Sequence, residues 1–399
     1  MFIDTSEFFL NRQILLTVFG VAFVIALAMT PLSILLARKI GAIDVPKDNR
    51  RMHQRAIPRF GGLAIYAGSM VTMGLFEGNN PSIQIAMLGG TLIYLVGVVD
   101  DLRNLHAGIK FFCQLVVAVL MFAMGLRIQF IENYFGEGVW HFGEVVCFVV
   151  TVLWIVGVTN TINLVDGLDG LAAGVTAIAA FSTAYIAYIH GYILGMPAVC
   201  LAMMALAGAC VGFLPFNFSP AKTFMGDGGS QYLGFMIAIL SVIGPLKRST
   251  VMTVALPIVI LAIPLFDTFF AILRRVVNRK PIMEADKGHL HHRLVASGYG
   301  QRRAVLMLYG ICGIMGVAAV LFSRDLFKDA TALCAIAMMY VYVFLTDASH
   351  KMPTIKAVNI AKEERKEGKN EAMKAEQDED GKETEQEKAP LDKEEPDTL

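Results

Sequence analysis

The sequence has few cysteines, and none is spaced as a metal ligand would be. All six lie inside apolar runs, so we interpret them as small hydrophobic packing residues. The N-terminus also lacks a basic stretch before its first apolar run and a small-residue cleavage site, so we expect that segment to be retained. No internal repeat is evident, and we expect no nucleic acid among the partners.

Apolar residues, in contrast, are abundant: 55% of the chain is hydrophobic and the mean hydropathy is +0.58. A soluble domain rarely has this composition, so we expect an all-α, polytopic integral membrane helical bundle. Apolar runs of about 17–25 residues predict membrane spans. We expect eleven, near 14–37, 61–76, 83–99, 109–126, 143–159, 170–189, 194–214, 230–246, 251–273, 304–322 and 330–346.

Basic residues predict the orientation of these spans. They crowd two loops, one after the first span and one after the ninth, whereas the loops on the opposite side carry one or two each. The positive-inside rule then puts both rich loops in the cytoplasm, with the N-terminus outside and the C-terminus inside. All the polar motifs described below fall on the cytoplasmic side.

The last part of the chain differs from the rest. Residues 351–399 carry 15 acidic and 10 basic side chains and few apolar ones. Such a stretch buries too little apolar surface to offset the entropy of ordering. We therefore divide the chain into a membrane-embedded domain, 1–350, and a charged, disordered cytoplasmic tail, 351–399.

Two adjacent acids, Asp100 and Asp101, close the third span. One acid there would serve to cap the next helix, but two at a bilayer boundary repel each other unless a cation is near. Lys110, at the start of the fourth span, either pairs with these acids or extends to the membrane surface.

The segment NTINLVDGLDGLAAG places polar side chains at every third position between two apolar runs. Asn160, Asn163, Asp166 and Asp169 would lie near one face of a helix, although the repeated Asp-Gly pairs are also typical of turns. Acids at the mouth of a membrane helix favour an ion or phosphate site.

A third motif, FNFSPAKTFMGDGGS, places Asp227 between glycines just before the eighth span. It is either a tight interhelical turn or a carboxylate surrounded by open backbone N–H groups, which would suit a metal-bound phosphate. A fourth, ADKGHLHHRL, lies in the second basic loop, where a zinc site lacks an obvious fourth ligand and phosphate binding is the better functional interpretation. Arg59, in PRFGG, would bring a guanidinium near an anionic ligand, and Asp267, inside the ninth span, needs a partner.

Carboxylates and a few cations thus gather on one membrane face. Oxygen ligands of this kind suit Mg²⁺, which usually binds one or two carboxylates plus substrate phosphates. The chemistry that these residues indicate is phosphoryl transfer at the membrane–cytosol boundary.

The motifs together resemble those of the polyprenyl-phosphate N-acetylhexosamine-1-phosphate transferases. The matching segments are DD at 100–101, NxxNxxDGLDGL at 160–171, FMGDGGS at 224–230, HLHHR at 289–293 and PRFGG at 58–62. The histidine pattern is similar to the branch that uses UDP-GlcNAc and undecaprenyl phosphate. The resemblance implies a bacterial plasma-membrane enzyme that moves a sugar-1-phosphate from a UDP-sugar to a polyprenyl phosphate and releases UMP, with Mg²⁺, or Mn²⁺ in its place.

By the same resemblance, the catalytic residues are Asp100, Asp101 and Asp227. Asp227 is the expected Mg²⁺ ligand, with Asp166 as a second candidate. The expected substrate-binding residues are Asn160, Asn163, Asp166, Asp169, Asn217, Phe224, His289, His291, His292, Arg293, Arg59 and Lys110.

Several alternatives stay open. Some relatives have a third acid where this chain has Asn104, so a role for an acid there is in doubt. A UDP-MurNAc-pentapeptide phosphotransferase of the same family and a cytoplasm-facing secondary transporter are the competing functions, and a homodimer is compatible with the sequence. The sequence does not choose between direct attack by the lipid phosphate and a covalent aspartyl intermediate.

Overall fold

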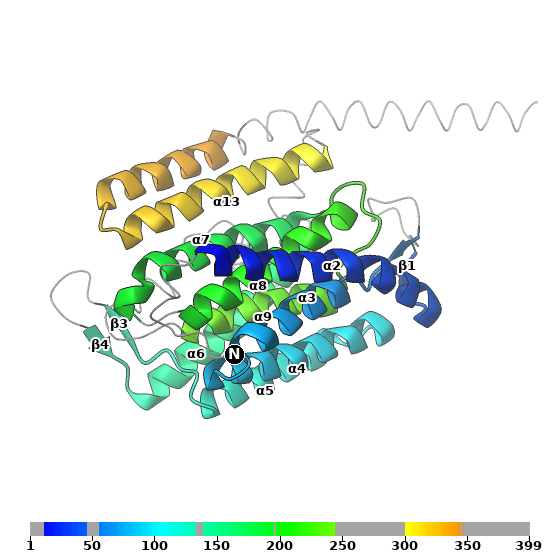
Figure 1. Cartoon of the computed structure of the whole chain (residues 1–399), viewed down its shortest axis with the longest axis horizontal. Helices are drawn as coiled ribbons and strands as arrows, with labels where there is room; N and C mark the ends of the chain where they lie inside the picture. Colours follow the sequence, from blue (N-terminus) through cyan, green and yellow to red (C-terminus); the bar gives the residue numbers. More distant parts are fainter. Residues whose placement is uncertain are drawn as a thin grey trace, which may run out of the picture.

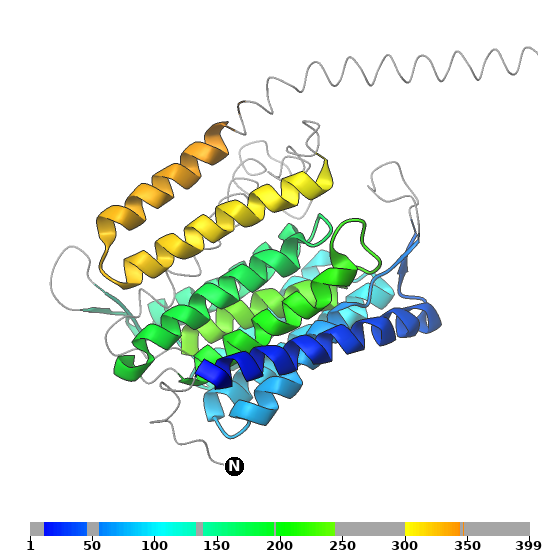
Figure 2. The same cartoon turned by 45° about the horizontal axis from the view of Figure 1, so that its top comes forward.

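The computed structural model describes residues 12–45, 56–132, 139–194, 197–243, 300–343 and 346, and these residues are mostly helical. The helices run side by side along one direction (Figures 1 and 2). They are α2 (Arg12–Ile40), α3 (Gly62–Glu77), α4 (Pro81–Arg103), α5 (Ala107–Ala123), α6 (Glu144–Val165), α7 (Leu171–Leu194), α8 (Pro197–Asn217), α9 (Gly226–Ile243) and α13 (Gln301–Ser323), with a further helical segment at 327–343.

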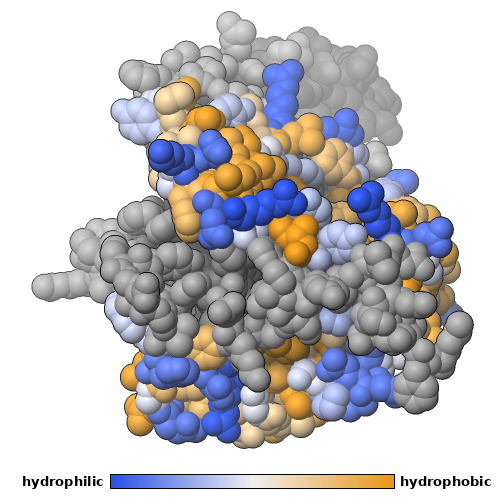
Figure 3. Space-filling view, turned by 60° about the vertical axis from the view of Figure 1, so that its left-hand side comes forward, coloured by the Kyte–Doolittle hydropathy of each residue, from blue (hydrophilic) through white to orange (hydrophobic). Residues whose placement is uncertain are grey.

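Two short antiparallel hairpins lie at opposite ends of the bundle (Figure 1). In one, β1 (Ile43–Asp44) pairs with β2 (Ile57–Pro58). In the other, β3 (Phe130–Glu132) pairs with β4 (Val139–His141). Figure 3 views the molecule from the side that bears β3 and β4, where hydrophilic and apolar residues are mixed.

Six of the described helices are long and apolar enough to cross a membrane, which confirms a polytopic membrane protein. They are α2, α4, α6, α8 and α13 over their full lengths, and α7 over Leu171–Ile189. Ten of the eleven predicted spans overlap described helices, and the ninth, 251–273, lies outside the described residues. The count of eleven and the orientation stay predictions, as does the tail.

Several helices extend beyond their predicted apolar runs, and two of these extensions carry predicted site residues with partners on other helices. Helix α6 continues to Val165, so Asn160 and Asn163 are helical, and α9 begins at Gly226 rather than near 230. At both places polar residues extend a helix beyond its apolar run and bond to another helix: Asn160 donates to Gln114 of α5, and the N–H of Asp227 donates to Asp101 of α4. Hydropathy alone does not detect such extensions.

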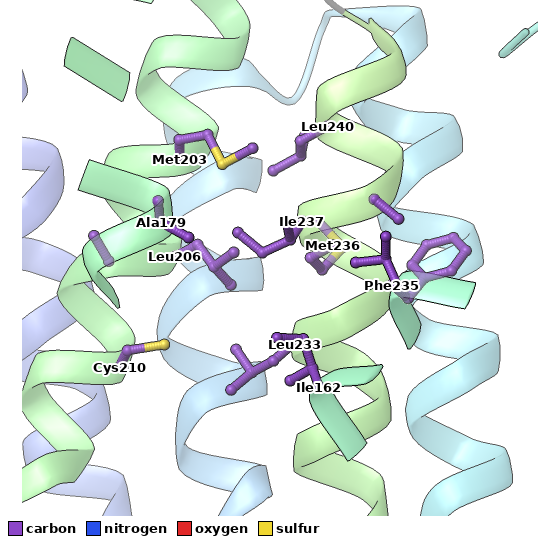
Figure 4. Packing of buried hydrophobic residues seen from close by; sticks show 14 of the residues in the cluster. Ile162, Ala179, Met203, Leu206, Cys210, Leu233, Phe235, Met236, Ile237 and Leu240 are labelled. Carbon is purple, nitrogen blue, oxygen red and sulfur yellow. The ribbon is translucent and has the colours of Figure 1, made fainter. Parts of the chain in front are cut away.

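Helix α9 lies at the centre of the bundle, since every residue from Gly228 to Val242 is buried. Figure 4 shows its Leu233, Ile237 and Leu240 among residues of other helices, such as Leu206. A helix that is apolar all round belongs in the interior.

Small residues let the backbones approach closely, which is how membrane helices associate in apolar lipid. A Cβ added at Gly97 of α4 would lie 2.5 Å from Gly228 Cα of α9. The start of α9 is therefore fixed against the end of α4.

Candidate active site

The end of α4 is tied to the start of α9 by the carboxylate of Asp101. Its Oδ1 accepts the backbone N–H of Asp227 at 2.9 Å, and its Oδ2 accepts that of Gly228 at 3.0 Å. The side chain is only 1% exposed. Asp101 therefore caps the N-terminus of α9 from a different helix, where negative charge is favoured.

This contact contradicts the expectation that the Gly-Asp-Gly-Gly segment presents open backbone N–H groups to a phosphate. The segment is the first turn of a helix, and the N–H groups of Asp227 and Gly228 are already bonded to Asp101. What it offers is the Asp227 carboxylate, whose side chain is 23% exposed.

Arg59 joins the two catalytic candidates Asp101 and Asp227. Its Nη2 lies 2.7 Å from Asp101 Oδ1 and 3.2 Å from Asp227 Oδ2, and its Nε donates to Asp101 Oδ1 at 3.1 Å. Burial lowers the pKa of Arg59, but the two carboxylates outweigh that effect and raise the pKa above its usual value. The guanidinium is therefore held charged inside the acidic cluster.

The backbone around Arg59 is joined to the segment that precedes α9. Phe224 N–H donates to the Pro58 carbonyl at 2.8 Å, and Gly61 N–H donates to the Phe224 carbonyl at 2.9 Å. The PRFGG segment thus contributes its guanidinium to the site, whereas the N–H groups of Gly61 and Gly62 are used within the protein. Phe224 is half-buried beside this junction, and its stacking on a base stays a prediction.

Asp100 has a different set of partners from Asp101. Its Oδ1 accepts the backbone N–H of Leu105 at 2.7 Å, and its Oδ2 lies 2.7 Å from Lys110 Nζ. The ion pair that was one of the two interpretations of Lys110 is therefore present. Burial raises the pKa of Asp227 to about 7, and the nearby carboxylates of Asp101 and Asp100 contribute to this rise, whereas Lys110 opposes it.

The loop between α6 and α7 brings two further acids to the same end of the bundle. Asp169 Oδ2 accepts the backbone N–H of Ala221 at 3.0 Å. Asn217, buried at the end of α8, accepts the Gly170 N–H at 3.1 Å and donates to the Thr223 carbonyl at 3.0 Å. The Asn217 amide is thus used to shape the loop, and direct contact with a nucleotide stays a prediction.

Acidic side chains outnumber basic ones in the part of this cluster that the structure describes. Burial raises the pKa of Asp166 well above its usual range, and the carboxylates of Asp227, Asp101 and Asp169 raise it further. Among the described residues, five carboxyl groups face two basic side chains, namely Asp100, Asp101, Asp166, Asp169 and Asp227 against Arg59 and Lys110. An additional cation would relieve this repulsion.

The donor set fits a metal that shares its ligands with a substrate. Within the described part of the chain, no group of three or more His, Cys, Asp or Glu side chains forms a complete metal site. Mg²⁺ commonly binds through one or two carboxylates together with substrate phosphates. Asp227 and Asp166 are suited to that mode, because both are partly exposed in the acidic cluster.

Beneath the acids lies a layer of amides that the sequence did not reveal. Asn160 Nδ2 donates to Gln114 Oε1 at 2.6 Å, and Gln114 Nε2 donates to Gln231 Oε1 at 3.0 Å. Among the described residues, the buried Gln231 Nε2 has no acceptor. Gln114 and Gln231 follow Lys110 and Asp227 by four residues, and that helical spacing was the available signal.

Asn163 connects α6 to α9 beside this layer. Its Oδ1 accepts a hydrogen bond from Ser230 Oγ at 2.6 Å. The remaining predicted site residues, His289, His291, His292 and Arg293, lie outside the described residues, as does Asp267.

Comparison with known proteins identifies the family. The model of glycosyl transferase family 4 matches residues 83–245. A probable undecaprenyl-phosphate N-acetylglucosaminyl 1-phosphate transferase of Bacillus subtilis (strain 168) is 39% identical over 328 residues, which cover 82% of this chain and 88% of that protein. The chain belongs to glycosyl transferase family 4.

More distant relatives extend the comparison. A decaprenyl-phosphate N-acetylglucosaminephosphotransferase of Mycolicibacterium smegmatis is 34% identical over 318 residues, 72% of this chain and 77% of that protein. An undecaprenyl-phosphate alpha-N-acetylglucosaminyl 1-phosphate transferase of Escherichia coli (strain K12) is 24% identical over 314 residues, 77% of this chain and 84% of that protein. The family assignment that the motifs implied is confirmed.

In this glycosyl transferase family 4 member, the matched segment 83–245 runs from α4 to the end of α9. It contains the five acids of the cluster. Arg59 and α13 lie outside it.

Proposed function

We propose that this protein transfers N-acetylglucosamine-1-phosphate from UDP-GlcNAc to undecaprenyl phosphate, giving undecaprenyl-diphosphate-GlcNAc and UMP. The observation that carries the proposal is the gathering of five carboxylates, Arg59 and Lys110 at one end of a membrane helical bundle, in a chain whose relatives bear that activity in their names. Phosphoryl transfer needs positioned groups and charge neutralisation more than covalent chemistry, and this cluster offers both.

In the proposed reaction, the lipid phosphate attacks the β-phosphorus of the sugar nucleotide in line, and the bond to the UMP oxygen breaks. Asp100, paired with Lys110, orients the lipid phosphate at the membrane-facing side of the cluster. Asn163, Asp166 and Asp169 line the nucleotide side, with Phe224 near the base. His291, His292 and Arg293 would contact the diphosphate or the sugar.

Asp227 would hold Mg²⁺, with Asp166 as a second ligand. When bound, the ion neutralises developing charge on the phosphates. Arg59 keeps the unligated Asp227 in place, and Asp101 fixes the helix start that carries it.

The same proposal assigns the site to the cytoplasmic side of a bacterial plasma membrane. The acidic cluster lies next to β2, and Arg59, which belongs to the first basic loop, pairs with two of its acids. This contact supports the positive-inside orientation, while eleven spans and a cytoplasmic tail from 351 to 399 complete the proposed topology.

Transfer of radiolabel from the sugar nucleotide into organic-extractable lipid tests the function. Purified protein is given UDP-GlcNAc, UDP-GalNAc or UDP-MurNAc-pentapeptide in parallel, with undecaprenyl or decaprenyl phosphate as acceptor. We expect transfer from UDP-GlcNAc with release of UMP. Transfer only from UDP-MurNAc-pentapeptide would assign the other branch, and no transfer with solute uptake would indicate a transporter.

Asp227→Asn tests the metal assignment, because the substitution keeps the size of the side chain and removes its charge. We expect transfer to fall at least 100-fold at a fixed Mg²⁺ concentration. The matched control is Asp325→Asn. Asp325 follows the C-terminal end of α13, far from the acidic cluster, so this variant should transfer at the wild-type rate. Wild-type transfer by Asp227→Asn would exclude Asp227 as the metal ligand.

A further inference from the structure

The backbone of Gly170, in the loop that carries Asp166 and Asp169, is held from two sides. Its N–H donates to Asn217 Oδ1 at 3.1 Å, and its carbonyl accepts a hydrogen bond from the hydroxyl of Tyr309. Gly170 has φ of +84°, a conformation that glycine adopts at no steric cost. The loop therefore meets α8 through Asn217 and α13 through Tyr309.

Tyr309 reaches the loop because α7 leaves room for its ring. A Cβ added at Gly174, one turn into α7, would collide with the Tyr309 ring. Nearer the start of α13, Arg302 Nε donates to the Ser219 carbonyl at 2.6 Å, in the segment that follows α8. One helix thus contacts the segments on both sides of the α7–α8 pair.

The loop has a reason to need such support. Asp166 lies in the field of Asp227, Asp101 and Asp169, and like charges at short range repel each other. Hydrogen bonds to the loop backbone oppose that repulsion without adding charge. Tyr309, which provides one of these hydrogen bonds, lies outside the segment that matches the family model, residues 83–245.

We propose that Tyr309 is a positioning residue for the sugar nucleotide: its hydroxyl fixes the Asp166–Asp169 loop in the geometry that binds UDP-GlcNAc. This inference rests on the proposed function for the identity of the ligand. It assigns no effect on the lipid acceptor, because the Asp100–Lys110 pair lies on α4 and α5, away from α13. Loss of the hydroxyl should therefore weaken the binding of UDP-GlcNAc and leave the binding of undecaprenyl phosphate unchanged.

The test is Tyr309→Phe, which removes only the hydroxyl. The matched control is Tyr185→Phe, since Tyr185 of α7 accepts a hydrogen bond from Arg324 at 3.2 Å, at the other end of the same pair of helices. We expect Tyr309→Phe to raise KM for UDP-GlcNAc by about twofold to tenfold, the range that one hydrogen bond gives. KM for undecaprenyl phosphate should stay at the wild-type value and the Tm should fall by at most a few degrees, whereas Tyr185→Phe should change neither KM.

Hydrogen–deuterium exchange over residues 166–175 supplies a readout that needs no substrate. We expect faster exchange in Tyr309→Phe than in wild type or Tyr185→Phe. Unchanged KM together with unchanged exchange would overturn the proposal. So would a lower Tm and active fraction with both KM values unchanged, because that pattern means a purely structural role.

The inference and the proposed function fail in different ways. If wild-type protein transfers no GlcNAc-1-phosphate, the proposed function is wrong and so is the ligand named here. Wild-type transfer combined with wild-type kinetics and exchange in Tyr309→Phe would overturn the positioning role alone.

Discussion

Asp101 is the acid whose neutralisation should most affect stability. It accepts four hydrogen bonds, two from Arg59 and one each from the N–H groups of Asp227 and Gly228. In Asp101→Asn the amide nitrogen cannot accept, so at least one of these donors loses its partner. The pairing with Arg59 also loses its charge.

The cost follows from the burial of this side chain. Loss of one hydrogen bond to a charged group costs about 1.5–3 kcal/mol, and breaking a buried ion pair costs about 3–5 kcal/mol. Arg59 keeps Asp227 at 3.2 Å, which favours the lower end, so we expect about 3 kcal/mol. Asp100→Asn is the matched comparison: its partner Lys110 is 24% exposed and can turn to water, so we expect about 1–2 kcal/mol.

Thermal unfolding in detergent, followed by the transfer assay, measures both effects. Asp101→Asn should unfold several degrees below Asp100→Asn, whereas Asp100→Asn should lose transfer with the smaller fall in Tm of the two. If Asp100→Asn proved as destabilising as Asp101→Asn, the assignment of a structural role to Asp101 and a catalytic role to Asp100 would be wrong.

Three further predictions concern packing, the membrane boundary and the metal. Gly97→Ala should lower the free energy of unfolding by about 1–3 kcal/mol, because the new Cβ would meet α9. Gly157→Ala, where nothing lies within 4 Å of the new Cβ, should raise it by up to about 1 kcal/mol. Chemical denaturation measures both, and equal effects would contradict the α4–α9 contact. Trp140, which is 57% exposed on β4, should lie at the level of the lipid headgroups. In a Trp154→Phe variant, Trp140 is the one remaining tryptophan, and lipids brominated near the headgroup should quench its fluorescence more than lipids brominated near the chain ends. The reverse order would contradict this placement of Trp140. Chelation by EDTA should abolish transfer and added Mg²⁺ should restore it, so transfer that continues in EDTA would refute the metal requirement.

The helices were predictable because membrane spans are visible in the sequence as long apolar runs. The start of α9 was not, because its first turn, residues 226–229, has no apolar pattern and is held by the carboxylate of Asp101 from α4. For the end of α6 the sequence left a helix and a turn open, and the partner of Asn160 is Gln114 of α5. A pattern within one segment carries no information about such partners. The same limit explains why the amide layer of Gln114 and Gln231 went unnoticed.

In the candidate site, too, the sequence predicted some features and not others. Asp100, Asp101, Asp166 and Asp227 were identifiable from their positions at span ends, but apart from the pairing of Lys110 with Asp100 their partners were not. Asp101 and the Asp227 N–H are 126 residues apart in sequence, and Tyr309 and Gly170 are 139 apart. Contacts over such separations depend on how the helices pack, which single-sequence motifs do not encode.

The cap on α9 has a consequence for how the protein treats small anions. Asp101 is a tethered anion that is always present at the helix end, so an anion from solution would have to displace it to reach the N–H groups of Asp227 and Gly228. Inorganic phosphate and sulfate should therefore be poor inhibitors at this helix end. For the same reason we expect these two N–H groups to contribute nothing to the binding of a phosphate-bearing substrate or product.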